Sequence, residues 1–195
     1  AKAADKTSPR VRIIEHPDVR RMLMLQKAWA EGMRALYFFT AHLQDKVEIA
    51  GGHGHPDAKQ LDRLNDLMLP ILKGVFSETC YEVLASSLQC FGGSGYCRDY
   101  PIEQYIRDAK IDTLYEGTTH IQALDLFFRK IARDGGQTLR TLMGQVQKTA
   151  KPQGDDDPLG VERAALADAL ADVNAMFATM LGKLNDSLYH VGFQG

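Results

Sequence analysis

Hydrophobic positions along the chain recur at steps of three and four residues over long stretches, which is the spacing of an α-helix. The first stretch starts at Pro17, a residue favoured at the first helical position because its missing N–H would have no partner there. A helix to about Ile49 would place these residues on one face: Met22, Leu25, Trp29, Met33, Leu36, Thr40, Leu43 and Val47. Other apolar residues lie off this stripe and indicate several packing neighbours: Leu23, Met24, Phe38 and Phe39.

A second long helix is predicted after a glycine-rich loop at 51–56, from residue 57 or 58 to about Leu88. Pro70 lies inside it and is expected to bend or break it, because proline removes a backbone donor and clashes with the preceding turn. The predicted apolar stripe contains Leu61, Leu64, Met68, Leu72, Val75 and Thr79.

The rest of the chain also has helical periodicity. A turn is expected at 91–96, a short helix at 102–108 and a helix at 118–133 that ends at the glycine pair after Asp134. A polar linker at 151–158 precedes a last helix at about 161–190. The inward positions are predicted to be Ile121, Leu124, Phe128 and Ile131 in the former helix, and Leu166, Leu170, Val173, Phe177, Met180, Leu184 and Leu188 in the latter.

No segment has the pattern of a strand, so the predicted fold class is all-α, an antiparallel bundle of long helices. The domain prediction is a bundle over 1–150, followed at 151–195 by a linker and the beginning of an additional C-terminal helical segment. The first residue is not methionine and the last helix lacks a stop signal. We therefore expect a piece of a longer chain.

Composition and charge argue against several classes of function. The 195 residues carry a net charge of −2, which argues against a nucleic-acid partner. No apolar run approaches the roughly 20 residues of a membrane helix, and the N-terminus lacks the apolar core of a signal peptide.

The odd cysteine count of three fits a reducing compartment. Cys90 and Cys97 are interpreted as small buried or turn-lining thiols, and His53 and His55 as solvated loop residues, so no metal site is predicted.

The segment from Gln89 to Gln122 carries the candidate chemistry. Three glycines within Gly92–Gly95 expose backbone N–H groups that a ligand can approach closely, although their spacing is not that of a dinucleotide fingerprint. Glu116 stands just before a helix, between an aromatic residue and a glycine. Apolar neighbours can raise the pKa of a carboxyl group into the range of a general base, whereas the plainer reading is an ordinary acid at a helix start.

An ion-pair cluster is the preferred reading of the RDAK motif, which contributes Arg107, Asp108 and Lys110.

Taken together, these motifs resemble the C-terminal domain of the acyl-CoA dehydrogenase family. The shared order is Q-x-x-G-G-x-G-Y, P-x-E, R-D-A-K-I, Y-E-G-T and I-Q, and the resemblance extends over roughly residues 11–133. The first helix looks most like the larger bacterial branch, which includes methylmercaptopropionyl-CoA dehydrogenase-like enzymes. That branch has extra C-terminal helices, which would begin at 151–195.

The resemblance implies a mechanism. In this family the acid of Y-E-G-T, here Glu116, removes the α-proton of an acyl-CoA thioester while the β-hydride goes to flavin N5. The product is the trans-2-enoyl-CoA. The Glu116 backbone N–H and the flavin ribose 2′-hydroxyl would stabilise the enolate-like oxygen. Tyr115 would line the acyl channel, and Gly117 would leave room for the thioester.

The resemblance also assigns FAD contacts. Gln89, Gly92 and Gly93 would reach the FAD of a neighbouring subunit, and Thr118 would lie at its adenosine diphosphate part. His120 stands where many members have glutamine, and its ring can still donate one hydrogen bond. Gln122 matches the family's glutamine.

Partners follow from the same resemblance. We expect an acyl-CoA substrate, an N-terminal helical and a middle β-domain of the same enzyme, a mate in a dimer or dimer of dimers, and an electron-transfer flavoprotein. The R-x-x-F-G segment of many relatives is absent. The 195 residues alone are expected to be inactive, and the bacterial branch favours a cytoplasmic location. The alternatives are an acyl-CoA oxidase, a non-catalytic family member, or a helical scaffold or oligomerisation module.

Overall fold

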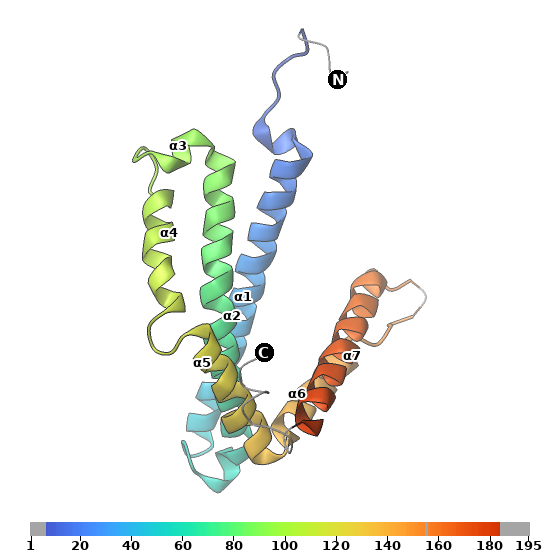
Figure 1. Cartoon of the computed structure of the whole chain (residues 1–195). Helices are drawn as coiled ribbons and strands as arrows, with labels where there is room; N and C mark the ends of the chain where they lie inside the picture. The colour runs from blue at the N-terminus through green and yellow to red at the C-terminus, as the bar shows by residue number, and fades with distance from the viewer. Residues whose placement is uncertain (1–6, 155, 184–195) are drawn as a thin grey trace. The chain divides into compact units, whose positions relative to one another are not determined.

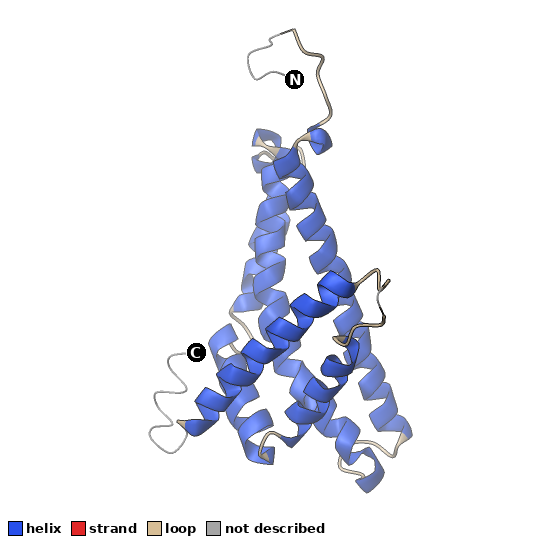
Figure 2. Cartoon of the chain, turned by 90° about the vertical axis from the view of Figure 1, so that its right-hand side faces the viewer, coloured by secondary structure: helices blue, strands red, loops and turns tan. Residues whose placement is uncertain are grey.

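The computed structural model describes residues 7–154 and 156–183, and all regular structure in these residues is helical (Figure 2). The predicted all-α fold class is confirmed. Figure 1 labels the α-helices in chain order, and short 3-10 helices join several of them. The α-helices are α1 (Pro17–Ile49), α2 (Lys59–Phe91), α3 (Gly93–Tyr96), α4 (Ile102–Lys110), α5 (Thr119–Leu124), α6 (Gln137–Thr149) and α7 (Gly160–Gly182).

The chain divides into two compact units, and the two longest helices contribute to both. The first unit contains residues 1–38 and 75–119, and the second contains residues 39–74 and 120–195. The division into a bundle at 1–150 and an extension at 151–195 stays a prediction.

A polar contact joins α1 and α2 within the first unit. Ser87 Oγ donates to Gln26 Oε1 at 2.8 Å, and the amide nitrogen of Gln26 lies 3.6 Å from Cys90 Sγ. Elsewhere in this unit, α4 lies alongside α2 (Figure 1). Lys110 Nζ lies 4.7 Å from the ring centroid of Tyr81, a cation–π contact between these two helices.

The second unit holds the largest fully buried side chains of the described residues. They are Val47 from α1, Leu67 from α2 and Ile131, which ends the π-helix (Asp125–Ile131) that continues α5. Lys130 Nζ on this π-helix donates to Asp66 Oδ1 of α2 at 2.5 Å. Apolar burial and an ion pair therefore both tie the π-helix to α2.

The predicted stripe of α1 is confirmed over most of its length, because Met22, Thr40, Leu43 and Val47 are buried. It is wrong at Leu25 and Trp29, which are 47% and 45% exposed. The polar Gln26 occupies the inward position there instead, since α2 offers serine hydroxyls at this level. On α2, Val75 is likewise exposed, while Leu64, Met68 and Thr79 are buried.

The predicted inward face of the helix at 118–133 is wrong in part. Ile121 is exposed, and Phe127 rather than Phe128 is the buried aromatic residue. The physical reason at Phe127 is the π-helix, which starts at Asp125 and whose wider turns shift which side chains face inward. Gly135 ends this helical run in the left-handed conformation, at φ 64°, as its sequence predicts.

Three local features differ from the sequence-based expectations. The expected turn at 91–96 contains the one-turn helix α3. Of the two effects expected at Pro70, a break does not occur, because α2 is continuous through it, and a bend stays a prediction. Helix α6 was not predicted, although Leu139, Leu142 and Val146 follow the helical spacing.

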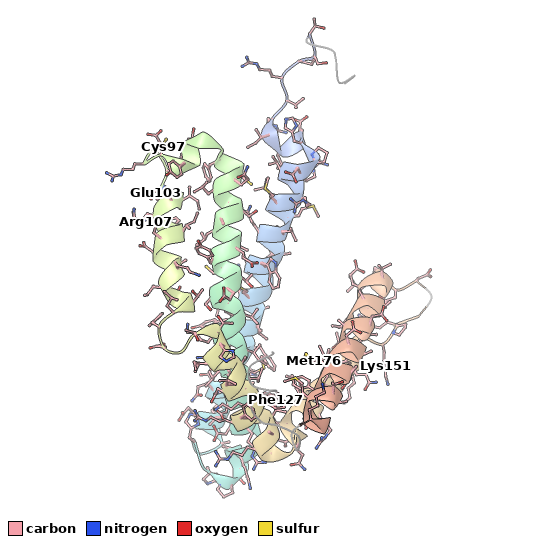
Figure 3. All side chains as sticks on the ribbon, viewed as in Figure 1. Cys97, Glu103, Arg107, Phe127, Lys151 and Met176 are labelled. Atoms are coloured by element: carbon pink, nitrogen blue, oxygen red, sulfur yellow. The ribbon has the colours of Figure 1, made fainter. Side chains whose placement is uncertain are left out.

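Helix α7 contains no fully buried residue. Its predicted seam is half-buried at Leu166, Leu170, Phe177 and Met180, whereas Val173 is exposed; Leu184 and Leu188 lie outside the described residues. Met176 projects from this helix with 49% of its surface exposed (Figure 3).

By length and composition, α7 is the one described helix that could cross a membrane, with a mean hydropathy of 1.3 over its most apolar window. A single helix of this kind is weak evidence for a membrane protein. The expected absence of a membrane span, which was drawn from uninterrupted apolar runs, stays a prediction.

Asp134 holds the start of α6. Its carboxylate accepts hydrogen bonds from the N–H of Gln137 (3.1 Å), the N–H of Thr138 (3.0 Å) and the Thr138 hydroxyl (2.5 Å). Partial burial raises the pKa of Asp134, but the bonds from Thr138, Gln137 and Gly136 outweigh it and hold that pKa below its ordinary value. The stabilisation is therefore present above the unfolded-state pKa and is lost as the pH falls through the lower folded-state pKa.

We predict that Asp134→Ala lowers the free energy of unfolding by about 1 kcal/mol at pH 7, because two helix-start N–H groups lose their acceptor. The difference from the wild type should shrink as the pH falls below about 4. Urea unfolding at pH 7 and pH 3 measures both effects. An equal difference at the two pH values would contradict the assignment to the ionised carboxylate.

Candidate active site

The connection between α4 and α5 positions the candidate base. A 3-10 helix (Ile111–Thr113) extends α4, and both the Leu114 N–H and the Tyr115 N–H donate to the Ile111 carbonyl, at 2.9 and 3.1 Å. Thr113 is buried, and its hydroxyl donates to the Lys110 carbonyl at 3.0 Å. These bonds hold the backbone in helical turns up to Tyr115, directly before Glu116.

Glu116 has the left-handed backbone conformation, with φ at 55°. It is the one non-glycine residue of the described chain with a positive φ, and Gly117 follows at φ 90°. For a residue with a Cβ, this conformation costs about 1–2 kcal/mol. Strain of this kind is concentrated at functional sites, where the surrounding structure enforces it. The Glu116 side chain is exposed, and Tyr115 beside it is 49% exposed.

The residues after Glu116 are anchored from α2. The Thr119 hydroxyl, at the first position of α5, donates to Glu78 Oε1 at 2.5 Å. Glu78 is half-buried on α2 and lies 41 positions away in sequence, so no local pattern could have predicted this contact. Of the predicted FAD contacts in this segment, Thr118 and His120 are exposed and Gln122 is half-buried.

The glycine-rich segment forms a second, separate group. Gly92, which precedes α3, has φ 60° and ψ −146°, a conformation that L-residues rarely adopt. Gly93 has no atom within 4 Å of where a Cβ would lie, whereas a Cβ on the buried Gly95 would come 2.6 Å from Phe91 Cβ. Packing within the described chain therefore explains glycine at 95 and not at 93. Gln89, three residues before Gly92, is exposed.

These two groups lie at opposite ends of α4. Helix α3 precedes its N-terminus, and the Glu116 turn follows its C-terminus (Figure 1). Nine residues of α-helix span about 14 Å. The structure thus brings Tyr115, Glu116, Gly117 and Thr118 together in one turn and keeps them apart from the Gln89–Gly93 segment.

The RDAK residues do not form the expected ion-pair cluster. Arg107 pairs instead with Glu103 one turn earlier on α4, at 4.0 Å (Figure 3), and Lys110 stacks on Tyr81. Helical geometry favours such i, i+4 partners over immediate neighbours, which point in different directions.

The other polar candidates have local partners. His53 Nδ1 lies 2.6 Å from Asp62 Oδ1, and all three cysteines are free thiols, of which Cys97 is exposed (Figure 3). Burial, with the Asp112 carboxylate as a smaller contribution, raises the pKa of the Cys80 thiol. Within the described residues, no group of three or more His, Cys, Asp or Glu side chains is arranged to hold a metal ion.

Comparison with known proteins decides the family. The family model of the acyl-CoA dehydrogenase C-terminal domain matches residues 1–129. This range includes the Gly92–Gly95 segment and Glu116. The chain belongs to the acyl-CoA dehydrogenase family. The resemblance stated from the sequence motifs is therefore confirmed.

Among curated relatives, the chain is 56% identical over 194 residues to the broad-specificity linear acyl-CoA dehydrogenase FadE5 of Mycobacterium tuberculosis, covering 96% of this chain and 32% of that protein. It is 38% identical to 3-methylmercaptopropionyl-CoA dehydrogenase of Ruegeria pomeroyi, over 89% of this chain and 29% of that protein. A butyryl-CoA dehydrogenase of Syntrophomonas wolfei is 33% identical, over 91% and 29%. The chain thus spans about a third of the length of these relatives.

A solved structure agrees in fold. The apo form of Bd2924 superposes with a TM-score of 0.60 at 24% identity, over 80% of this chain and 33% of that one.

We predict that, in the absence of FAD, Gly93→Ala leaves the stability of the protein unchanged or slightly higher, because a Cβ there meets open space in this chain and alanine favours the helix. Gly95→Ala is the matched comparison and should lower the free energy of unfolding by about 1–3 kcal/mol, since the added methyl overlaps Phe91 and the Leu88 carbonyl. Urea unfolding measures both. A Gly93→Ala variant as destabilised as Gly95→Ala would contradict the distinction.

We also predict that Glu116→Gly is more stable than Glu116→Ala by about 1 kcal/mol, because glycine relieves the strain at φ 55° and alanine does not. Both variants lose the carboxylate, so the comparison isolates the backbone conformation. Equal unfolding free energies would mean that position 116 is not strained.

Proposed function

We propose that this chain is the base-carrying part of a flavin-dependent acyl-CoA dehydrogenase that oxidises an acyl-CoA thioester to the trans-2-enoyl-CoA. The observation that carries the proposal is the left-handed conformation of Glu116 within Y-E-G-T, since a fold holds a glutamate in such a conformation at a cost in stability. Family membership and identity to three curated acyl-CoA dehydrogenases support the reaction class.

Glu116 is the proposed general base. Its carboxylate takes the proton from the thioester α-carbon, and the electron pair of the broken C–H bond becomes the new double bond as a hydride leaves the β-carbon. An α-C–H bond is a weak acid, so the base must be held in place before the reaction. The bonds from Leu114 and Tyr115 to the Ile111 carbonyl and the Thr119–Glu78 bond fix the chain on both sides of Glu116.

The neighbours of Glu116 are proposed to hold the substrate. Tyr115 presents an exposed aromatic ring that can line the acyl channel, and Gly117, which lacks a side chain, leaves room for the thioester. The Glu116 backbone N–H is the proposed donor to the thioester oxygen, on which negative charge develops as the proton leaves.

FAD is the proposed cofactor, and it would contact residues of both groups, all of which are exposed except the half-buried Gln122. Thr118, His120 and Gln122 would hold the adenosine diphosphate part, and Gln89, Gly92 and Gly93 would contact the FAD of a second subunit. The open space at Gly93 fits an external ligand close to the backbone. Bound FAD supplies the acceptor for the β-hydride.

The exposed apolar side chains of the first unit support a larger assembly. On α1, Met24 is 65% and Phe38 62% exposed, and Trp29 and Tyr37 are also exposed. Apolar surface of this extent is typical of interfaces. We propose that the N-terminal and middle β-domains of the enzyme and a dimer mate cover it, and that the 195 residues alone are inactive. Reduced enzyme would pass electrons to an electron-transfer flavoprotein, in the bacterial cytoplasm.

We predict that Glu116→Gln in the complete enzyme retains FAD and acyl-CoA binding but slows flavin bleaching by substrate by about 10²–10⁴-fold, because an amide cannot accept the α-proton. Stopped-flow absorbance after mixing with acyl-CoA measures the rate, and titration measures binding.

Glu103→Gln is the control, because it removes a half-buried carboxylate on α4 that pairs with Arg107 and lies outside the Y-E-G-T segment, and it should leave the bleaching rate unchanged. Near-normal bleaching by Glu116→Gln would show that another group is the base.

A further inference from the structure

A small basic pocket lies in the second unit, between α2 and the helical run that follows α5. It has a volume of about 270 Å³. The lining side chains are Arg63 and Asp66 of α2, Arg129 and Lys130 of the π-helix, and Arg133, Asp134 and Thr138 after it. The π-helix is the one that carries Phe127 (Figure 3).

The paired charges of this pocket cancel one another. Lys130 Nζ lies 2.5 Å from Asp66 Oδ1 and 3.7 Å from Asp125 Oδ2, and Arg129 lies 3.0 Å from Asp125 Oδ1. These two cations and two aspartates form one neutral network.

Asp134, the third carboxylate near the pocket, has its own partners. Its two oxygens accept from the N–H groups of Gln137 and Thr138 and from the Thr138 hydroxyl. The positive end of α6 also faces it. Its charge is therefore compensated within the chain.

Arg63 and Arg133 are the two charged side chains of the pocket that take no part in these interactions. Both side chains are exposed, and within the described residues neither has a hydrogen-bond or ion-pair partner. They come from two different segments and face the same pocket. Two guanidinium groups that converge in this way suit an anion with several acceptor oxygens, because each fork can donate two parallel hydrogen bonds.

A second hollow adjoins the basic pocket and shares Arg63 and Thr138 with it. Its volume is about 770 Å³. Its wall combines side-chain amides and hydroxyls with apolar side chains and one further charge of each sign: Pro56, Asp57, Lys59, Gln60, Leu61, Leu64, Gln137, Thr141 and Gln145. Such a mixed wall suits an organic group that has both polar atoms and an apolar face.

We propose that Arg63 and Arg133 bind the phosphate group of a phosphorylated small molecule, whose organic part occupies the adjoining hollow. Phosphate is favoured over a carboxylate because its oxygens surround one atom and can accept from both guanidinium groups at once, whereas a carboxylate has two oxygens. The site lies in the second unit, whereas Glu116 belongs to the first, and the inference does not depend on the proposed dehydrogenase activity.

The test is calorimetric titration of the complete protein with inorganic phosphate and with adenosine 5′-monophosphate, at constant ionic strength in chloride. Wild type should bind phosphate and should bind the nucleotide more tightly, because the hollow adds contacts. R63Q and R133Q should each weaken phosphate binding about tenfold, since each removes charge-assisted hydrogen bonds. R107Q on α4 is the control, because it removes an exposed arginine of the first unit.

Circular dichroism first verifies that the variants fold, which is expected for exposed side chains. Three results would overturn the proposal: no phosphate binding by wild type, unchanged binding by the R63Q/R133Q double variant, or equal binding of succinate. Nucleotide binding no tighter than that of phosphate would overturn the assignment of the hollow.

Discussion

The left-handed turn at Glu116 is the constraint on which the candidate site depends. A glutamate adopts φ 55° only when the chain on both sides is held. The buried Thr113 and the two N–H bonds to the Ile111 carbonyl hold the chain before Glu116 in helical turns, and the Thr119–Glu78 hydrogen bond fixes the next helix to α2. Every proposed role of the Y-E-G-T segment follows from this arrangement, because it presents a carboxylate on an exposed, rigid turn.

The two units differ in how they are stabilised. The second has fully buried side chains from three helices and an ion-pair network between α2 and the π-helix. The first relies more on polar contacts such as Gln26–Ser87 and leaves large apolar side chains of α1 exposed. The chain spans about a third of the length of its relatives, and this open apolar surface supports the proposal that other domains and a dimer mate cover it.

The three glycines of the Gly92–Gly95 segment differ in their structural roles. Gly92 supplies an unusual backbone conformation, and Gly95 permits close packing at the end of α2. Gly93 meets neither requirement within the described chain, and it is the glycine for which we propose a contact with FAD. Three glycines that look alike in sequence thus have different surroundings once the atoms are placed.

The sequence by itself determined what depends on neighbouring residues: the helical spacing, the start at Pro17, the left-handed end at Gly135 and the motifs that reveal the family. Tertiary structure decided which side chains those helices bury, because burial depends on partners distant in sequence. Gln26 faces inward where Leu25 and Trp29 were expected, and a π-helix buries Phe127 in place of Phe128. The Thr119–Glu78 hydrogen bond and the pocket lined by both Arg63 and Arg133 likewise bring together residues 41 or more positions apart, which no local pattern encodes.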